Sequence, residues 1–105
     1  MIRAEFFSQA GRPVGFRLRG HSGYSGAGTD IVCAAVSSAA YLTANTVTDA
    51  AGSEADVFVK DGVMFLKLFS PENAAAGAIL RGFRLHMKGL QEQYPQNIQI
   101  TDTEV

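Results

Sequence analysis

Apolar residues along this chain change repeatedly from the spacing of a strand to the spacing of a helix, and no other feature of the sequence limits the fold as strongly. Residues 2–6 and 14–19 alternate apolar and polar side chains, as strands do when one face covers a core. The connection at 9–13 contains glycine and proline, which favour a turn. We therefore expect a two-stranded hairpin that ends at Gly20.

A helix is expected from Ile31 to about Val47. Asp30 precedes a run of small and apolar residues, and Asp is among the side chains that cap a helix N-terminus best. The run is rich in Ala, which implies close packing against a neighbouring surface. Apolar residues recur in it at helical spacing, at positions 32, 35, 36, 39 and 42.

A second hairpin is expected after a polar connection at 49–56. Residues 57–59 and 63–68 have the composition of strands. Asp61-Gly62 between them predicts a type I′ turn, because that turn needs positive φ at both central residues. The connection at 49–56 is too short to separate two domains.

A second helix is expected with Ser70 as its N-cap and Pro71 at its first position, extending to about Gln93. Tyr94-Pro95 ends it, and residues 97–101 alternate as a final strand. The apolar residues of this helix keep helical spacing, at positions 76, 79, 80, 83, 87 and 90, and its polar side carries Arg81, Arg84, Lys88 and Glu92.

The order of elements is therefore β-β-α-β-β-α-β. Hairpins that alternate with helices are typical of α+β domains, so we expect a mixed, largely antiparallel five-stranded sheet that carries both helices. A chain of 105 residues is one domain of ordinary size, which buries roughly two-thirds of its unfolded surface.

The composition argues against some classes of partner. The 9 Lys and Arg against 10 Asp and Glu give a formal net charge of −1, which provides no basic field for direct nucleic-acid binding. No apolar run approaches the ~20 residues that span a bilayer, so no membrane association is expected. A protein or peptide partner fits this balance better.

The cysteine content indicates the compartment. A single Cys excludes an intramolecular disulfide, and Met1 leads directly into strand residues rather than into a signal segment. We expect a cytoplasmic protein, because a thiol stays reduced in that compartment.

The segment at 20–38 contains the single cysteine and one of the two histidines of the chain. Its glycines predict that the first half is a mobile loop. Cys33 then falls in the first turn of the expected helix, and His21 lies at the other end of the loop. One fold of this loop would bring the imidazole and the thiol together.

A thiol at the start of a helix has chemistry that an interior cysteine lacks. The unpaired backbone N–H groups there carry partial positive charge, which favours thiolate over thiol, and an imidazolium from His21 would stabilise the thiolate further. An attack of Cys33 on a carbonyl creates an oxyanion that needs hydrogen-bond donors. The backbone amides of Val32 and Cys33 are the candidate donors.

Two further residues each have two interpretations. Asp30 is expected first as the N-cap of the helix, although its second oxygen would also allow it to orient His21. Ser37 lies one helical turn after Cys33 on the same face. Its hydroxyl either bonds near the thiolate or bonds back to a helix carbonyl.

Less reactive interpretations stay open from these residues alone. Cys33 is flanked by small apolar residues, and such a cysteine is more often a buried hydrophobe than a nucleophile; His21 fits an exposed loop residue. A zinc site lacks paired ligand spacing, and a phosphate loop lacks its Lys-Ser/Thr ending, so we expect no metal and no cofactor. His86, within the second helix, is interpreted as a surface or packing residue.

Two stretches around the loop form a motif: Gly20-His21-Ser22-Gly23 and Gly28-Thr29-Asp30-Ile31-Val32-Cys33-Ala34-Ala35-Val36-Ser37. This motif resembles the signature of the bacterial ribosomal-processing cysteine protease family called Prp. The resemblance extends to the length of the chain and the order of its elements. It implies that residues 1–105 form a single cysteine protease domain.

The resemblance also implies a function. Members of this family remove a short N-terminal extension from a large-subunit ribosomal protein, with the His and Cys of these motifs as a catalytic dyad, here His21 and Cys33. Asp30 and Ser37 match the supporting residues of the family. The resemblance further implies a homodimer, and an extension with hydrophobic and aromatic residues before the cut.

The family has a flexible loop that orders over bound peptide. The matching residues here are Gly23, Tyr24, Ser25, Gly26, Ala27 and Gly28. Tyr24 and Ser25 differ from the small residues expected there. The bulk of Tyr24 is expected to alter the closed shape of the loop and to leave the dyad unchanged.

A second class of function is a non-catalytic module that binds a peptide and assists ribosome assembly. In that hypothesis Cys33 is simply buried, and an exposed edge of the sheet accepts an extended peptide by strand addition. The reactivity of the thiol separates the two hypotheses.

Overall fold

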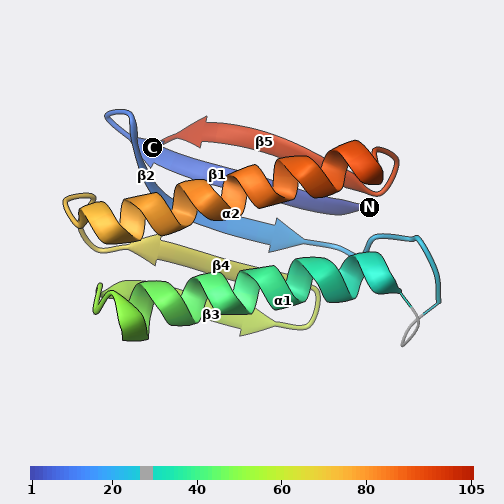
Figure 1. Cartoon of the computed structure of the whole chain (residues 1–105), viewed down its shortest axis with the longest axis horizontal. Helices are drawn as coiled ribbons and strands as arrows, with labels where there is room; N and C mark the ends of the chain where they lie inside the picture. Colours follow the sequence, from blue (N-terminus) through green and yellow to red (C-terminus); the bar gives the residue numbers. More distant parts are fainter. Residues whose placement is uncertain (27–29) are drawn as a thin grey trace.

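The computed structural model of the chain describes residues 1–26 and 30–105. A five-stranded mixed sheet carries both helices on one face, so the expected α+β architecture and order of elements are confirmed (Figure 1). The elements are β1 (Ile2–Gln9), β2 (Arg12–Arg19), α1 (Ile31–Asn45), the π-helical segment η1 (Thr46–Ala50), β3 (Ala55–Lys60), β4 (Val63–Leu68), α2 (Ala74–Gln93) and β5 (Ile98–Glu104).

The strands lie in the order β3-β4-β2-β1-β5. β1 pairs antiparallel with β2 and parallel with β5, while β4 pairs antiparallel with both β2 and β3. The first and last strands of the chain are therefore neighbours, and β3 and β5 form the two edges of the sheet. This order places the end of β2 beside the β3–β4 turn, since Arg19 pairs with Val63.

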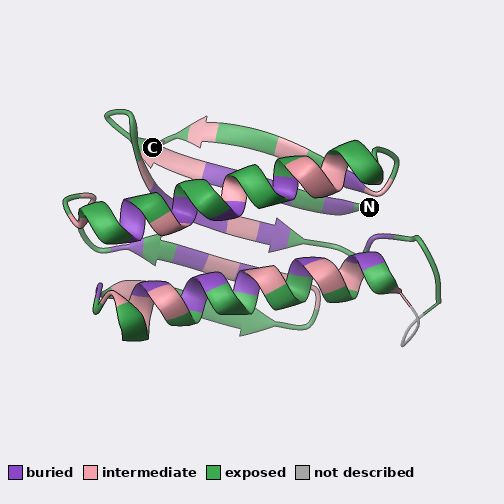
Figure 2. Cartoon of the chain, viewed as in Figure 1, coloured by how far each residue is buried: buried purple, intermediate pink, exposed green. Residues whose placement is uncertain are grey.

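The core lies between the sheet and the two helices, where the buried residues of α1, α2 and the central strands face one another (Figure 2). Phe83 of α2 makes edge-on contacts with two strand residues, at ring-centroid distances of 5.7 Å to Phe6 and 4.8 Å to Phe16. Such edge-on pairs add to the free energy gained from burial alone. The expected inward face of α1 is wrong at Leu42, which is 69% exposed.

The start of the second helix differs from the sequence prediction. α2 begins at Ala74, and its N-cap is Asn73, whose side-chain oxygen accepts a hydrogen bond from the backbone N–H of Ala76 (3.0 Å). The Ser70 hydroxyl instead accepts from the backbone N–H of Glu72 (3.4 Å), inside a turn. Ser and Asn are both strong capping residues. Because the Ser70 hydroxyl bonds within the turn, Asn73 rather than Ser70 caps the helix.

The β3–β4 hairpin is present, but its turn is not the predicted type I′. Lys60 pairs with Val63, and of the two residues between them Gly62 has positive φ (+75°) whereas Asp61 does not. Negative followed by positive φ is the pattern of a type II turn. Asp61 avoids a positive φ that costs a side chain steric energy, and the Gly62 carbonyl accepts a hydrogen bond from Gly20 N–H (2.9 Å), which ties the turn to the end of β2.

The expectation about membrane-length segments also needs correction. The helical stretch Ile31–Ala50 is long and apolar enough to cross a bilayer by length and composition alone, with a mean hydropathy of 1.3. Its many alanines keep this average high although the longest apolar runs are short. One face of the stretch packs on the sheet, but only 33% of the apolar window is buried in the fold.

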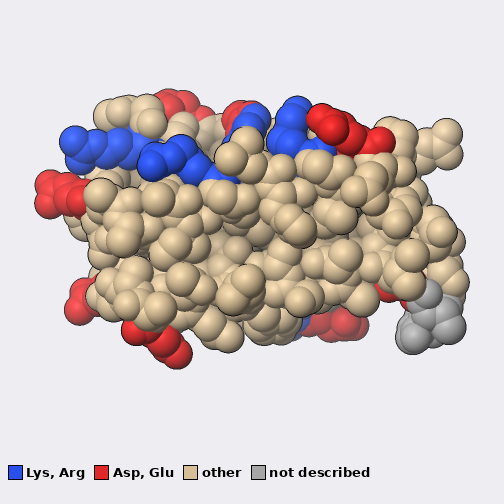
Figure 3. Space-filling model, viewed as in Figure 1, with Lys and Arg blue, Asp and Glu red and all other residues tan. Residues whose placement is uncertain are grey.

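The charged side chains are distributed unevenly over the helix face of the molecule. Figure 3 shows Lys, Arg, Asp and Glu along the outer flank of α2 and around the margins. The part of α1 from Ile31 to Asn45 contains none of these residues. The surface over α1 and between the helices is accordingly uncharged over the residues that the view describes.

Gly15 of β2 lies where β4 comes closest to it. A Cβ at this position would collide with the backbone carbonyl oxygen of Leu66, which has no freedom to swing aside. We expect Gly15→Ala to lower the free energy of unfolding by about 1–3 kcal/mol in urea denaturation.

The matched control is Gly82→Ala in α2, where an added Cβ would meet nothing within 4 Å. That change should raise the stability by up to about 1 kcal/mol through helix propensity. Similar values for the two variants would contradict the close approach of β2 and β4.

Candidate active site

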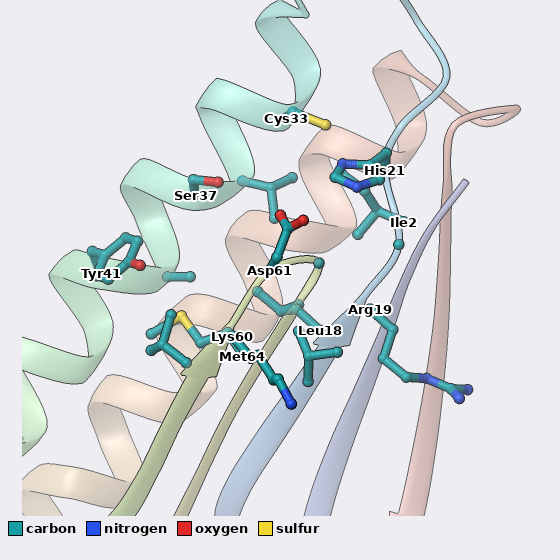
Figure 4. A pocket seen from close by; sticks show the side chains of 16 residues that line it. Ile2, Leu18, Arg19, His21, Cys33, Ser37, Tyr41, Lys60, Asp61 and Met64 are labelled. Carbon is teal, nitrogen blue, oxygen red and sulfur yellow. The ribbon is translucent and has the colours of Figure 1, made fainter. Parts of the chain in front are cut away.

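A cavity of about 530 Å³ opens between the start of α1 and the β3–β4 turn. His21 and Cys33, the two residues predicted to act together, both line it. In Figure 4 the Cys33 sulfur points toward the His21 ring. The fold therefore brings an imidazole and a thiol to one cavity from opposite ends of the connection between β2 and α1.

Cys33 lies in the first turn of α1, as the sequence predicts. It is half-buried, and its Sγ accepts a hydrogen bond from the backbone N–H of Ser22 (3.2 Å). A negatively charged sulfur accepts such a bond more strongly than a neutral one. The thiol is thus held in place by the residue next to His21 and remains accessible from the cavity.

Asp30 is the N-cap of α1. Its Oδ1 accepts hydrogen bonds from the backbone N–H groups of Val32 and Cys33, both at 3.0 Å, and its Oδ2 accepts from the Ser22 hydroxyl. The Ser22 hydroxyl and then the Cys33 amide lower the pKa of Asp30 from its ordinary 3.8 to about 2. The capping interpretation is confirmed, and both carboxylate oxygens are used by groups other than the imidazole.

The sequence interpretation missed Ser22, although this residue lies at the centre of the site. Its side chain is buried; its hydroxyl donates to Asp30 and accepts from the Tyr24 backbone N–H (3.1 Å). Its carbonyl oxygen accepts from the Asn97 side-chain amide (3.0 Å). The position of Ser22 next to His21 was the sequence signal that could have identified it. No sequence signal pointed to Asn97, because it is distant from Ser22 in the chain.

The backbone amides of Val32 and Cys33 are not free to hold an oxyanion in this structure. Both N–H groups already donate to Asp30 Oδ1. The sequence prediction for these two donors is therefore wrong for this conformation, because the side chain that caps the helix uses the donors that the cap exposes.

Ser37 lies one turn after Cys33 and lines the same cavity, with its hydroxyl directed into the space beside α1 (Figure 4). The hydroxyl forms no hydrogen bond to any residue that the structure describes, so neither of its two predicted bonds is present there. It is exposed and free to meet a bound molecule.

The loop that follows His21 is described as far as Gly26, whereas Ala27 and Gly28 of the predicted flexible loop lie outside the described residues. Tyr24 packs edge-on against Tyr94 at the end of α2, with ring centroids 5.5 Å apart. The bulky residue that departs from the family pattern therefore anchors the first part of the loop to α2.

The β3–β4 turn forms the wall of the cavity opposite α1. Asp61 lines the cavity with its carboxylate directed upward between α1 and His21 (Figure 4). His21 Nε2 lies 3.7 Å from where a Cβ on Gly62 would be. The sequence interpretation treated these two residues only as a turn, because their proximity to His21 arises from the pairing of β2 with β4.

The candidate metal ligands do not gather. Within residues 1–26 and 30–105, no group of three or more His, Cys, Asp and Glu side chains is arranged to hold a metal ion. His86 is exposed on α2, away from the cavity that contains His21.

The thiol can form a covalent bond to a carbonyl carbon, and the imidazole can take up and return a proton. This chemistry defines the class of the protein as a cysteine hydrolase. The family model described as cysteine protease Prp matches residues 1–99, and the chain belongs to this family. The protein is therefore a cysteine protease.

Solved structures share this fold. A ribosomal processing protease Prp from S. aureus, in complex with a covalently linked product peptide, is similar over 98% of this chain and 100% of its own, with 23% identity and a TM-score of 0.93. The same protease with a substrate peptide gives 22% identity and a TM-score of 0.88 over the same shares of the two chains.

A third structure, SMU.848 from Streptococcus mutans, is 25% identical, with a TM-score of 0.85 over 100% of this chain and 96% of that one. A search of functionally curated proteins found no match. The shared fold therefore covers essentially the whole chain.

The Ser22 hydroxyl provides a test of the capping network. We expect Ser22→Ala to raise the pKa of Asp30 toward its ordinary value, because the largest cause of the lowering is removed. A pKa below the ordinary value means that the Asp30 carboxylate stabilises the wild-type fold fully above about pH 4, and that this contribution is lost as the pH falls toward 2. The variant should have a lower free energy of unfolding at neutral pH. Its free energy of unfolding should also fall less than that of wild type between about pH 4 and pH 2.

The measurements are urea denaturation across this pH range and NMR titration of the carboxyl carbons. Asp102 serves as the internal reference, because Arg84 holds the pKa of that carboxyl below its usual range at a separate place. Its titration should be the same in both proteins. An Asp30 titration that Ser22→Ala leaves unchanged would refute the network.

Proposed function

We propose that this protease removes a short N-terminal extension from a large-subunit ribosomal protein, with His21 and Cys33 as its catalytic dyad. The observation that carries the proposal is the placement of the Cys33 sulfur and the His21 ring on one open cavity (Figure 4). Membership of the Prp family supports the substrate class, and a related S. aureus protease of ribosomal processing binds a substrate peptide.

The dyad divides the reaction into two steps. His21 takes the proton of Cys33, the thiolate attacks the scissile carbonyl carbon, and a tetrahedral intermediate forms. As the C–N bond breaks, His21 returns the proton to the leaving amine and a thioester remains on Cys33. His21 then takes a proton from water, the hydroxide attacks the thioester, and the released thiolate regains a proton from His21.

In this proposal Asp30 is a positioning residue that acts through Ser22. Its carboxylate holds the start of α1 and the Ser22 hydroxyl, and the Ser22 amide in turn holds the Cys33 sulfur. Ser37 supports the reaction from the cavity wall, where its hydroxyl faces the space that the substrate would fill. We assign the reaction to the cytoplasm, where the thiol stays reduced.

The direct test is incubation with the ribosomal precursor of the same organism, read by intact mass. Wild type should release the extension, and Cys33→Ala should lose cleavage by at least about a thousand-fold while still binding the precursor, because the side-chain change is small. His21→Ala should also lose most of the cleavage. Cleavage by Cys33→Ala at the wild-type rate would rule out the thiol as nucleophile.

Thiol alkylation distinguishes this proposal from the peptide-binding module. A catalytic Cys33 should react with iodoacetamide at neutral pH faster than free cysteine, and His21→Ala should slow it. A rate no faster than that of free cysteine in both proteins would favour the non-catalytic module.

We also propose that the protein is a homodimer. The uncharged surface over α1 and between the helices supports an association, and Leu42 of α1 and Leu85 of α2 are each 69% exposed. Sedimentation equilibrium should give twice the chain mass of 11.2 kDa, and Leu42→Glu with Leu85→Glu should reduce it to the single value. A monomeric wild type would refute the dimer.

A further inference from the structure

One face of the sheet is left open, because both helices lie on the other face (Figure 1). Residues that pair directly across neighbouring strands point to the same side of a sheet. The register of the strands therefore places three rows of side chains on the open sheet face. These rows are Lys60-Val63-Arg19-Arg3-Gln99, Phe58-Phe65-Arg17-Glu5-Thr101 and Asp56-Lys67-Gly15-Phe7-Thr103.

The open sheet face is cationic, although the chain as a whole is not. It carries five of the nine Lys and Arg residues and only two of the ten Asp and Glu residues. One of these two carboxylates, Glu5, is already paired with Arg17 (Nη2 to Oε1, 2.6 Å) and accepts a hydrogen bond from the Thr103 hydroxyl (2.7 Å). The formal net charge of −1, on which the expectation of no nucleic-acid binding rests, thus conceals a local basic field.

Three arginines surround a hollow of about 290 Å³ on this face. Its lining residues are Arg3, Arg17, Arg19, Glu5, Gln99 and Thr101. Within residues 1–26 and 30–105, Arg19 forms no ion pair, and Arg17 Nε is buried without a hydrogen-bond partner. Buried donors are nearly always paired, and guanidinium groups match the oxygens of a phosphate. A phosphate in the hollow would supply the missing acceptor once the Arg17 guanidinium turns toward it.

Aromatic rings lie beside this arginine hollow. Phe65 pairs directly with Arg17 on one side and with Phe58 on the other. The Phe65 ring packs against Phe7, with ring centroids 6.0 Å apart, whereas Phe58 at the edge of the sheet is 52% exposed. Exposed aromatic rings on a sheet, next to guanidinium groups, provide a surface on which unpaired bases stack.

We propose that the open sheet face binds single-stranded RNA, with a phosphate in the arginine hollow and an unpaired base on Phe58. The local positive charge complements a polyanion and would repel the same face of a second copy. An acidic peptide offers no bases to the aromatic rings, and a double helix keeps its bases stacked inside.

This inference goes beyond the proposed function, because it adds a second partner on the other side of the sheet. RNA is the expected nucleic acid, since the proposed substrate is a ribosomal protein. Contact with RNA would hold the protease near a substrate that is bound in an RNA-containing particle.

Binding is measured by fluorescence anisotropy with a fluorescein-labelled oligouridylate of about ten nucleotides, a length within the range of known single-strand sites. Wild type should bind with a Kd of about 1–100 μM at about 50 mM salt, the range typical of sequence-independent binding. RNA duplex of the same length should bind several-fold more weakly. The proposal would be overturned by a Kd above about 100 μM for the single strand, or by a duplex that binds as tightly.

Substitutions separate the phosphate contacts from the base contact. Arg3→Ala and Arg19→Ala should each weaken binding about three- to ten-fold and make the slope of log Kd against log salt shallower by about 0.7, because each removes a phosphate contact. Phe58→Ala should weaken binding about ten-fold and leave this slope unchanged, because a stacked ring releases no counterion.

The matched controls lie on the helix side of the molecule. Arg81→Ala changes an exposed arginine of α2, and Tyr41→Ala changes an aromatic residue of α1 that is exposed to about the same extent as Phe58, 49% against 52%. Both controls should bind the oligouridylate as wild type does. Arg3, Arg19 and Phe58 are also exposed, so all five variants should retain the fold.

Two results for the variants would overturn the assignment. Equal losses of affinity in Arg3→Ala and Arg81→Ala would place the binding site elsewhere. Weaker binding by the arginine variants, with Phe58→Ala equal to wild type and polyglutamate competing as well as unlabelled oligouridylate, would assign the face to an acidic polypeptide instead of RNA.

A second readout keeps this inference separate from the proposed function. Arg3→Ala and Phe58→Ala should cleave a short peptide that spans the cut site at the wild-type rate, because neither residue lines the cavity with the dyad. Cys33→Ala should bind the oligouridylate as wild type does. Cleavage without RNA binding would refute this inference alone, whereas RNA binding without cleavage would refute the proposed function alone.

Discussion

The site depends on one carboxylate. Asp30 holds the first amides of α1 with one oxygen and the Ser22 hydroxyl with the other, so a single side chain joins the helix that carries Cys33 to the strand end that carries His21. The same bonds lower the pKa of Asp30 to about 2, which keeps it charged at any physiological pH. The charge that stabilises the helix start therefore also sets the position of the thiol.

The second requirement is the pairing of β2 with β4. This pairing places the Asp61-Gly62 turn against His21 and makes the turn one wall of the cavity, with α1 as the other. His21 and Cys33 thus reach the cavity from the two ends of one connection, that between β2 and α1.

Much of this protein follows from local patterns. The alternation of residues in the hairpins, the apolar spacing of the helices and the capping residue Asp30 predicted the order of elements and the helix start that contains Cys33. Errors arose where two local signals competed. Ser70 and Asn73 are both good caps, and the hydrogen bond from Ala76 N–H selects Asn73. Asp61-Gly62 suits more than one turn type, and the hydrogen bond from Gly20 N–H ties the turn to β2. The sequence pattern encodes neither bond.

The sequence by itself determined the α+β class, the cap at Asp30 and the presence of a thiol at a helix start, because each depends on residues within a few positions of one another. The tertiary structure alone decided that Ser22 bonds to both Asp30 and the Cys33 sulfur, that Asn97 supports Ser22, and that Val57 and Val59 of β3 stay partly exposed. Those features depend on strand order and on how far α1 covers the sheet, and contacts between distant segments carry no local periodicity.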